Sequence, residues 1–311
     1  MGSQLRPKAL LVLVIAALLT ISATSAISPG IVVVLKAMGV AEVQVDEIAI
    51  RTLELMAIAA TVVALVFLGG GGKAAWGIAF ECAVVRRLSV GFVCGVLSLG
   101  LVCVVLYAFD VRVVRHDLPL QFGYWFEAFA SAMLSAVVVG VLEEVWFRGG
   151  LLTLLRRCSG VALAVFGGSV FYAATHFLAI PGGLNGSDEH QFTTFQLLQA
   201  AAQNMFQLQH LDSFVALCIA GVTLALIRLR QGDVAMCIGI HVGWVLTIKL
   251  FKKLTYVSPS ATNRFLAGQY DDVIGWVAAA SLAIMFVLVW RFVRPRASLA
   301  VTQPASEGER K

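Results

Sequence analysis

A series of long apolar stretches dominates this sequence, and each has the length that crosses a lipid bilayer. A membrane-spanning helix needs about 20 consecutive apolar residues. Eight stretches meet this requirement, at roughly 9–29, 50–70, 89–109, 124–142, 160–180, 212–230, 233–250 and 271–293. We therefore predict an all-α fold, a polytopic transmembrane helix bundle of about eight spans.

The composition supports a chain that is solvated mainly by lipid. Hydrophobic residues make up 59% of the chain and charged residues only 13%, against roughly 25% charged residues in soluble domains. The basic residues are dispersed in short segments between the spans, whereas a nucleic-acid-binding domain gathers them on one face. We expect the lipid bilayer as a partner, and no nucleic acid.

Six cysteines are distributed singly along the chain, and none forms a C-x-x-C pair: Cys82, Cys94, Cys103, Cys158, Cys218 and Cys237. Most of them lie in apolar runs, where cysteine serves as a small packing residue. Neither a disulfide framework nor a thiolate metal site is expected.

The first apolar stretch admits two interpretations. It follows Arg6 and Lys8 and ends in small residues, as a signal peptide does, but its length favours an uncleaved span. Lysine and arginine are enriched in cytoplasmic loops. With both termini inside, the inner segments hold fifteen of these residues and the outer segments eight. This bias predicts an integral protein of the plasma (inner) membrane with both termini in the cytoplasm.

Other segments differ from ordinary spans. Gly69 to Gly72 is a four-glycine turn after the second span. Residues 181–211 are polar and glutamine-rich with interleaved apolar side chains, and two interpretations stay open, an amphipathic lid over a site or a plain loop. No internal repeat is visible, so the sequence lends no direct support to an inverted-repeat transporter.

Ionisable side chains within the spans are the strongest indication of function, because a charge in a membrane helix is unfavourable. Glu143, Glu144 and Arg148 occur together at the end of the fourth span. On a helix, Glu144 and Arg148 lie one turn apart and can pair. Glu143 points about 100° away from Glu144, so its carboxylate stays available for a different role. Two adjacent, partly desolvated carboxylates hold a proton more readily, and such a group can take a proton from water.

Two histidines lie in spans that have few other polar side chains, His176 in the fifth and His241 in the seventh. Imidazole can relay protons, bind a metal or stabilise an oxyanion. Taken singly, the carboxylates are also consistent with boundary charges at the membrane surface, and each histidine with a hydrogen-bonded core residue. Because no HExxH or other closely spaced zinc pair occurs, any site has to be assembled across separate helices.

Three short motifs, in order along the chain, resemble those of the CAAX-protease and bacteriocin-processing (CPBP) family of intramembrane proteases. E-E-V-W-F-R at 143–148 resembles the EExxxR motif, Y-A-A-T-H at 172–176 resembles FxxxH, and H-V-G-W-V at 241–245 resembles HxxxN/D. The resemblance extends over roughly residues 125–250 and implies a type II CAAX prenyl endopeptidase-like protease. Its substrate would be a membrane-bound or lipid-modified protein or peptide.

The resemblance also implies roles for six residues: activation of water by Glu143 and His176, oxyanion stabilisation by His241, and orientation of the site by Glu144, Arg148 and Tyr172. Members of the family have been described both as glutamate-type and as metal-dependent proteases. If a divalent metal such as zinc is used, the resemblance implies Glu143, His176 and His241 as its ligands.

The chain departs from the motifs at two positions. Tyr172 stands where the family has Phe, a mild exchange of one aromatic residue for another. Val245 stands where the family has Asn or Asp, so the side chain that would share the oxyanion hole is missing, and one such donor is worth about 100- to 1,000-fold in rate. A catalytically weakened or inactive scaffold that binds a partner is therefore kept as an alternative. A proton-coupled transporter, in which the buried Glu and His residues form a relay, is a further alternative.

These observations divide the chain into four parts: N-terminal transmembrane helices (1–123), CPBP-like catalytic core helices (124–250), the last loop with the C-terminal span (251–296), and a cytoplasmic tail (297–311). The tail is polar and expected to be disordered.

Overall fold

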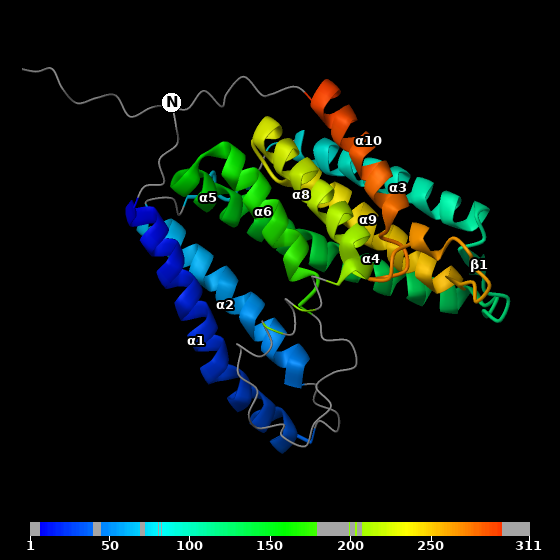
Figure 1. Cartoon of the computed structure of the whole chain (residues 1–311), viewed down its shortest axis with the longest axis horizontal. Helices are drawn as coiled ribbons and strands as arrows, with labels where there is room; N and C mark the ends of the chain where they lie inside the picture. Colours follow the sequence, from blue (N-terminus) through cyan, green and yellow to red (C-terminus); the bar gives the residue numbers. More distant parts are fainter. Residues whose placement is uncertain are drawn as a thin grey trace, which may run out of the picture.

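The computed structural model describes residues 7–39, 45–68, 72–79, 81, 83–178, 199, 203 and 207–293. Most of the segment 181–211, for which a lid and a plain loop are both open interpretations, lies outside the described residues, as do most of the four-glycine turn and the predicted tail. The described chain is a bundle of long helices (Figure 1).

The helices are α1 (Pro7–Ala37), α2 (Val45–Phe67), α3 (Ala83–Ala108), α4 (Phe122–Glu144), η1 (Val145–Leu151), α5 (Leu152–Ser159), α6 (Val161–Thr175), η2 (Leu208–His210), α8 (Leu211–Gln231), α9 (Ala235–Leu254), η3 (Arg264–Leu266) and α10 (Trp276–Phe292). Two short strands, β1 (Arg112–Val114) and β2 (Thr255–Val257), pair antiparallel. Six helical segments of the described chain are long and apolar enough to cross a membrane, and α6 and α10 are shorter apolar helices. The predicted all-α polytopic bundle is confirmed.

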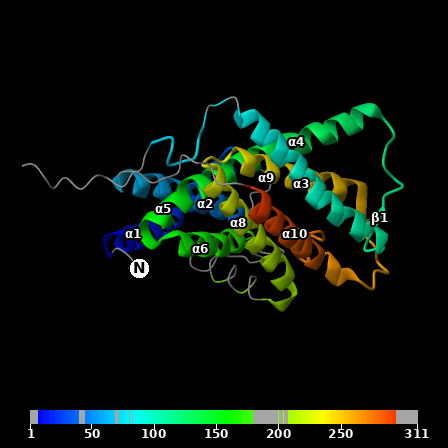
Figure 2. The ribbon, with the colours of Figure 1, turned by 90° about the horizontal axis from the view of Figure 1, so that it is seen from above.

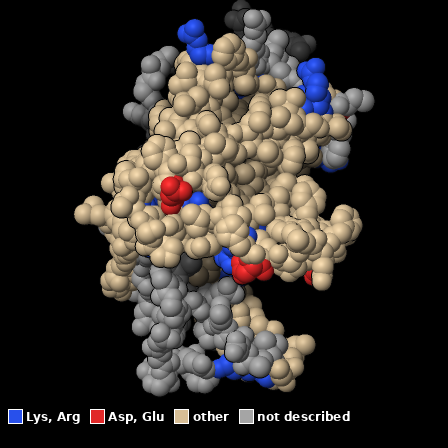
Figure 3. All heavy atoms as spheres, turned by 90° about the vertical axis from the view of Figure 1, so that its right-hand side faces the viewer, with Lys and Arg blue, Asp and Glu red and all other residues tan. Residues whose placement is uncertain are grey.

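The outer surface of the bundle is apolar. Large hydrophobic side chains point outward along successive helices, among them Val66, Leu97, Leu134 and Leu288. Charged side chains are sparse on the face seen in Figure 3. A patch of this extent would favour aggregation in water, whereas lipid tails solvate it without cost, and the helices satisfy their own backbone hydrogen bonds.

Helix α9 lies at the centre of one half of the bundle and packs against both α3 and α4. Two G-x-x-x-G pairs form the contact with α3, Gly91 with Gly95 on α3 and Gly239 with Gly243 on α9. A Cβ atom added at Gly95 would collide with the backbone of Ile240. Small residues let helix backbones approach closely in a membrane, and this close approach fixes the position of the α9 segment between Gly239 and Gly243.

The other half is built around α8, which packs between α6 and α10. Helices α1 and α2 pair with each other and lie to one side of the remaining bundle, as Figures 1 and 2 both show. They contact it through η1 and α5. The bundle is therefore open enough at this side to form the cavities described below.

Three helix boundaries differ from the predicted spans. The fourth helical segment continues without interruption to Ser159, so the carboxylates lie inside a long helical rod and not at its end. Helix α6 ends at Thr175, with His176 at its C-terminus. Helix α10 begins only at Trp276, because the Asp271 carboxylate accepts hydrogen bonds from the backbone N–H groups just after it and holds a turn.

Replacing Gly239 by Ala should destabilise the protein, because the new methyl group meets the backbone of Leu88. Overpacking of this kind costs about 1–3 kcal/mol, which a denaturant titration of the purified protein in detergent measures. Gly100→Ala is the matched control, since nothing lies near its added Cβ. Equal stability of the two variants would contradict the close α3–α9 packing.

Candidate active site

The predicted carboxylates lie where α4 passes into the π-helical segment η1. A π-helical turn is rare and often marks a functional site, because it changes the direction of the side chains that follow. Trp146, Phe147 and Arg148 are all buried in this turn. Gly149 follows them, and its lack of a side chain lets the backbone of Trp76 pack directly against η1.

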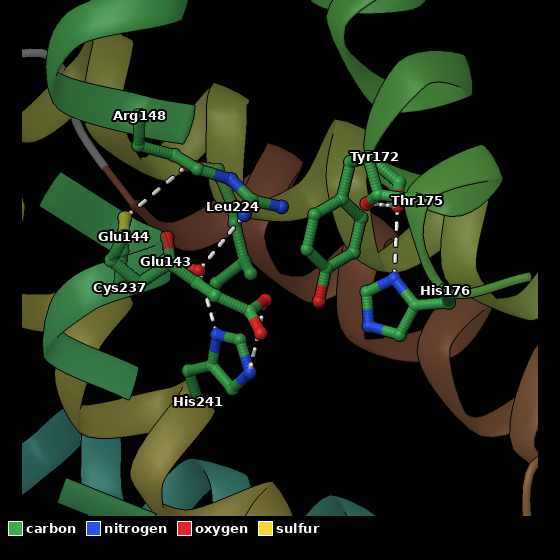
Figure 4. Close-up of polar contacts among 9 residues, drawn as sticks. All are labelled: Glu143, Glu144, Arg148, Tyr172, Thr175, His176, Leu224, Cys237 and His241. Carbon is green, nitrogen blue, oxygen red and sulfur yellow. Dashed lines mark hydrogen bonds and ion pairs between the residues drawn. The ribbon is translucent and has the colours of Figure 1, made fainter. Parts of the chain in front are cut away.

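A fully buried carboxylate, that of Glu144, lies at the centre of the site (Figure 4). Its Oε1 accepts a hydrogen bond from Arg148 Nη1 at 2.9 Å and one from His241 Nδ1 at 2.8 Å. Charged hydrogen bonds of this kind are about twice as strong as neutral ones. The expected Glu144–Arg148 pair is present, and the contact with His241 additionally ties α4 to α9.

The neighbouring carboxylate of Glu143 has a different environment. Its side chain is 29% exposed, and its Oε2 lies 3.9 Å from His241 Nε2. Within the described part of the chain, this buried oxygen has no hydrogen-bond partner. A buried carboxylate oxygen requires a polar partner, so this atom is suited to hold a water molecule.

His176 approaches from the end of α6. Its Nδ1 lies 2.9 Å from the backbone carbonyl oxygen of Tyr172 and therefore donates its proton there. In the neutral ring this leaves Nε2 as an acceptor. Figure 4 shows the Nε2 edge turned toward the gap that Glu143 also faces.

Tyr172 stands between the two histidines. Its ring centroid lies 4.7 Å from that of His176 and 6.5 Å from that of His241. The Arg148 guanidinium carbon lies 4.2 Å from the ring centroid on the other side, within the range of a cation–π interaction. Tyr172, only 3% exposed, is thus a packed spacer at the centre of the site.

A cavity of ≈ 490 Å³ opens beside these groups, and Glu143, His176 and Tyr270 line it together. Arg51 and Glu54 of α2 belong to the opposite wall. Its volume is in the range of ordinary ligand pockets. The site therefore has room for a ligand next to the Glu143 carboxylate.

A second cavity of ≈ 400 Å³ lies between α1, α2 and α6, with an almost wholly apolar lining. Both cavities have Glu54, Trp146, Thr175 and Leu178 in their walls, so they adjoin. An apolar chamber thus lies next to the cavity that contains the carboxylate and the histidine.

Tyr270 is a cavity residue that the sequence analysis missed. It belongs to the connection between α9 and α10, and its ring lies 4.9 Å from that of Phe177 and 6.4 Å from that of His176. Burial, together with the negative charges of Asp271 and Glu143, raises the pKa of its hydroxyl, which therefore stays protonated. No motif marks this residue, and only the folding of the last loop onto α6 reveals it.

The metal ligands implied by the resemblance do not converge into a site. Among the described residues, no three His, Cys, Asp or Glu side chains are placed to hold one ion. Glu143 and His241 are close, but the Tyr172 ring separates His176 from His241.

Val245 lies one turn beyond His241 and packs into an apolar cluster with Ala132, Ala136 and Leu246. Its side chain brings no polar group to the site. At the position where the HxxxN/D motif has a polar residue, this chain therefore has a hydrophobic contact between α4 and α9.

A comparison with protein-family models matches residues 125–247 to the family described as type II CAAX prenyl endopeptidase Rce1-like. The match begins in α4 and ends in α9, so it contains both carboxylates, Arg148 and both histidines. It confirms the family resemblance drawn from the motifs, and supports a CAAX-type membrane protease at the level of the family. Neither the curated proteins nor the solved structures yield a match to the chain.

Glu144→Gln should destabilise the protein strongly, since it leaves the Arg148 guanidinium buried without its countercharge. Breaking a buried ion pair from one side costs about 3–5 kcal/mol. Arg51→Gln is the control, because its pair with Glu54 is largely exposed and such pairs contribute about 0–1 kcal/mol. Unfolding titrations in detergent compare the two, and a Glu144→Gln protein as stable as Arg51→Gln would refute the central role of the buried pair.

Proposed function

Starting from the match of its core helices to the Rce1-like type II CAAX prenyl endopeptidase family, we propose that this protein is an intramembrane endopeptidase that uses Glu143 as its general base. The observation that carries the proposal is the buried Oε2 of Glu143, which has no hydrogen-bond partner among the described residues and lies beside His241, on a residue that lines the same cavity as His176. A carboxylate in this setting can remove a proton from water.

In the proposed reaction, a water molecule bound to Glu143 attacks the carbonyl carbon of the scissile peptide bond, and the Nε2 edge of His176 orients it. Glu143 takes the water proton, and a C–O bond forms as the carbonyl becomes an oxyanion. The intermediate collapses with cleavage of the C–N bond, and Glu143 passes its proton to the leaving amine. The atoms and charges balance without a further reactant.

His241 is proposed to face the developing negative charge. Glu144 holds its Nδ1, so the Nε2 edge is directed toward Glu143 and the reacting atoms. In its cationic form the ring donates from both nitrogens. Glu144 and Arg148 act as positioning residues, because Glu144 holds the His241 ring and Arg148 in turn holds the Glu144 carboxylate.

The adjoining cavities support a lipid-modified peptide as the substrate. A peptide segment fits the cavity that Glu143 lines, and a hydrocarbon chain attached to it fits the apolar chamber between α1, α2 and α6. Burial of each methylene group in such a chamber contributes about 0.8 kcal/mol. The lipid chain would therefore anchor the substrate, and the peptide would be presented to the carboxylate.

We further propose that the protein lies in the plasma (inner) membrane with both termini in the cytoplasm. The greater number of Lys and Arg residues in the segments on that side supports this orientation.

Glu143→Gln and His176→Ala should each lower kcat by about 100- to 10,000-fold, since each removes a group that handles the reacting water. The measurement is cleavage of a farnesylated C-a-a-X peptide by the protein reconstituted in liposomes. Glu127→Gln, an exposed carboxylate on the same helix, and His116→Ala, an exposed histidine, are matched controls. Absence of cleavage by the wild type, or full activity of Glu143→Gln, would refute the proposal.

Ala174→Phe should raise KM for the farnesylated peptide, because the ring fills part of the apolar chamber. Displacing about three methylene groups corresponds to about 50-fold in affinity, with little change in kcat. Ala162→Phe, on the exposed side of the same helix, is the control. An unchanged KM in Ala174→Phe would exclude this chamber as the lipid site.

A further inference from the structure

We propose that the hydroxyl group of Tyr172 is a hydrogen-bond donor to the oxyanion, in the place that Val245 leaves without a donor. The inference rests on the proposed endopeptidase function and names a further catalytic residue for it. From its motif, Tyr172 is expected to orient the site as an aromatic residue, whereas Figure 4 shows its hydroxyl pointing into the gap beside Glu143.

The first support is the position of the hydroxyl. The Tyr172 ring is fixed by an edge contact with Phe147 at 5.1 Å and by the neighbouring His176 at 4.7 Å. Figure 4 shows its oxygen directed into the gap between the Glu143 carboxylate and the His176 ring. A carbonyl attacked by water held on Glu143 would place its oxygen in the same gap. A rigid donor that points to this position stabilises charge without reorganisation.

The second support is that this donor is uncommitted. The side-chain hydrogen bonds of His176 and Thr175 to Tyr172 both end on its backbone carbonyl oxygen. Within the described residues, the hydroxyl itself makes no hydrogen bond, although the residue is 3% exposed. A hydroxyl group that makes no hydrogen bond inside the protein can donate to a bound ligand. Substrate, arriving through the cavity, would supply the acceptor.

The third support is electrostatic. The Arg148 guanidinium, 4.2 Å from the Tyr172 ring centroid, holds a permanent positive charge on the far side of the ring. The ion pair with Glu144 offsets part of this charge, and the remainder favours a negative charge near the hydroxyl once Glu143 has taken the water proton. Residue 245 offers no alternative, because its valine side chain packs into the apolar cluster between α4 and α9.

Tyr270 is the rival donor, since it lines the cavity, whereas Tyr172 lies behind the lining residues Phe147 and His176. The Tyr270 ring contacts His176 and Phe177, whereas Tyr172 is in ring contact with both catalytic histidines and carries the arginine on its face. The geometry therefore favours Tyr172, and the two residues are separable by experiment.

The decisive variant is Tyr172→Phe, which removes the hydroxyl and keeps the ring. We expect kcat for the farnesylated peptide to fall about 100-fold, with KM unchanged, because the hydroxyl acts only on the transition state. Tyr256→Phe, an exposed residue of β2, is the matched control. Unchanged kcat in Tyr172→Phe, or a loss confined to Tyr270→Phe, would overturn the inference.

Restoration of the missing donor gives a second test. In the Tyr172→Phe background, Val245→Asn introduces an amide one turn from His241, on the same face of α9. We expect the double variant to recover at least about tenfold of the lost kcat. A double variant as slow as Tyr172→Phe would contradict an exchange of donors between positions 172 and 245.

A binding measurement separates this inference from the proposed function. A farnesylated peptide in which a phosphinate replaces the scissile bond carries a tetrahedral, negatively charged group. Tyr172→Phe should weaken its binding about 100-fold and leave binding of the uncleaved peptide unchanged. Equal phosphinate affinity in both proteins overturns the inference. If the wild type binds the phosphinate more tightly than Tyr172→Phe does but never cleaves the peptide, the protease proposal is refuted. The role of Tyr172 as a hydrogen-bond donor to the negatively charged group is then still supported.

Discussion

The arrangement of the site depends on the hydrogen bonds that the buried Glu144 carboxylate makes with Arg148 and His241. A charge in a membrane interior is tolerated only with charged or strongly polar partners. Arg148 supplies one from the next turn, and His241 supplies the other from a different helix. The two hydrogen bonds to the Oε1 atom of Glu144 therefore set the register between α4 and α9. The direction of Glu143, the next residue in the chain, follows from the same register.

The helix packing that surrounds this carboxylate is of the kind that a lipid environment favours. Helices in a bilayer gain nothing from hiding apolar surface from water, so they associate through close backbone contact and buried polar bonds. The glycines of α3 and α9 provide the close backbone contact, and those of α9 lie on either side of His241. The hydrogen bonds of Glu144 are the buried polar bonds. Structural support and proposed chemistry thus use the same short segment of α9.

The cavity walls come from a wider part of the chain than the catalytic motifs. Residues 125–247 match the family model, but Arg51 and Glu54 of α2 and Tyr270 of the last loop complete the cavity. The adjoining apolar chamber is formed largely by α1 and α2. We infer that the chemistry belongs to the matched core, whereas substrate selection depends on the helices outside it.

The sequence alone determined the helical class, the spans and the principal site candidates. Apolar length is a local property, and so is the one-turn spacing of Glu144 and Arg148; both can be read without knowing how helices pack. The contact of Glu144 with His241 joins residues 97 positions apart, and the place of Tyr270 depends on a loop folding back. Tyr172 is expected from its motif to orient the site, but the sequence alone does not reveal where its hydroxyl points. Only the tertiary structure decided these features, since each depends on the distance between atoms on separate helices.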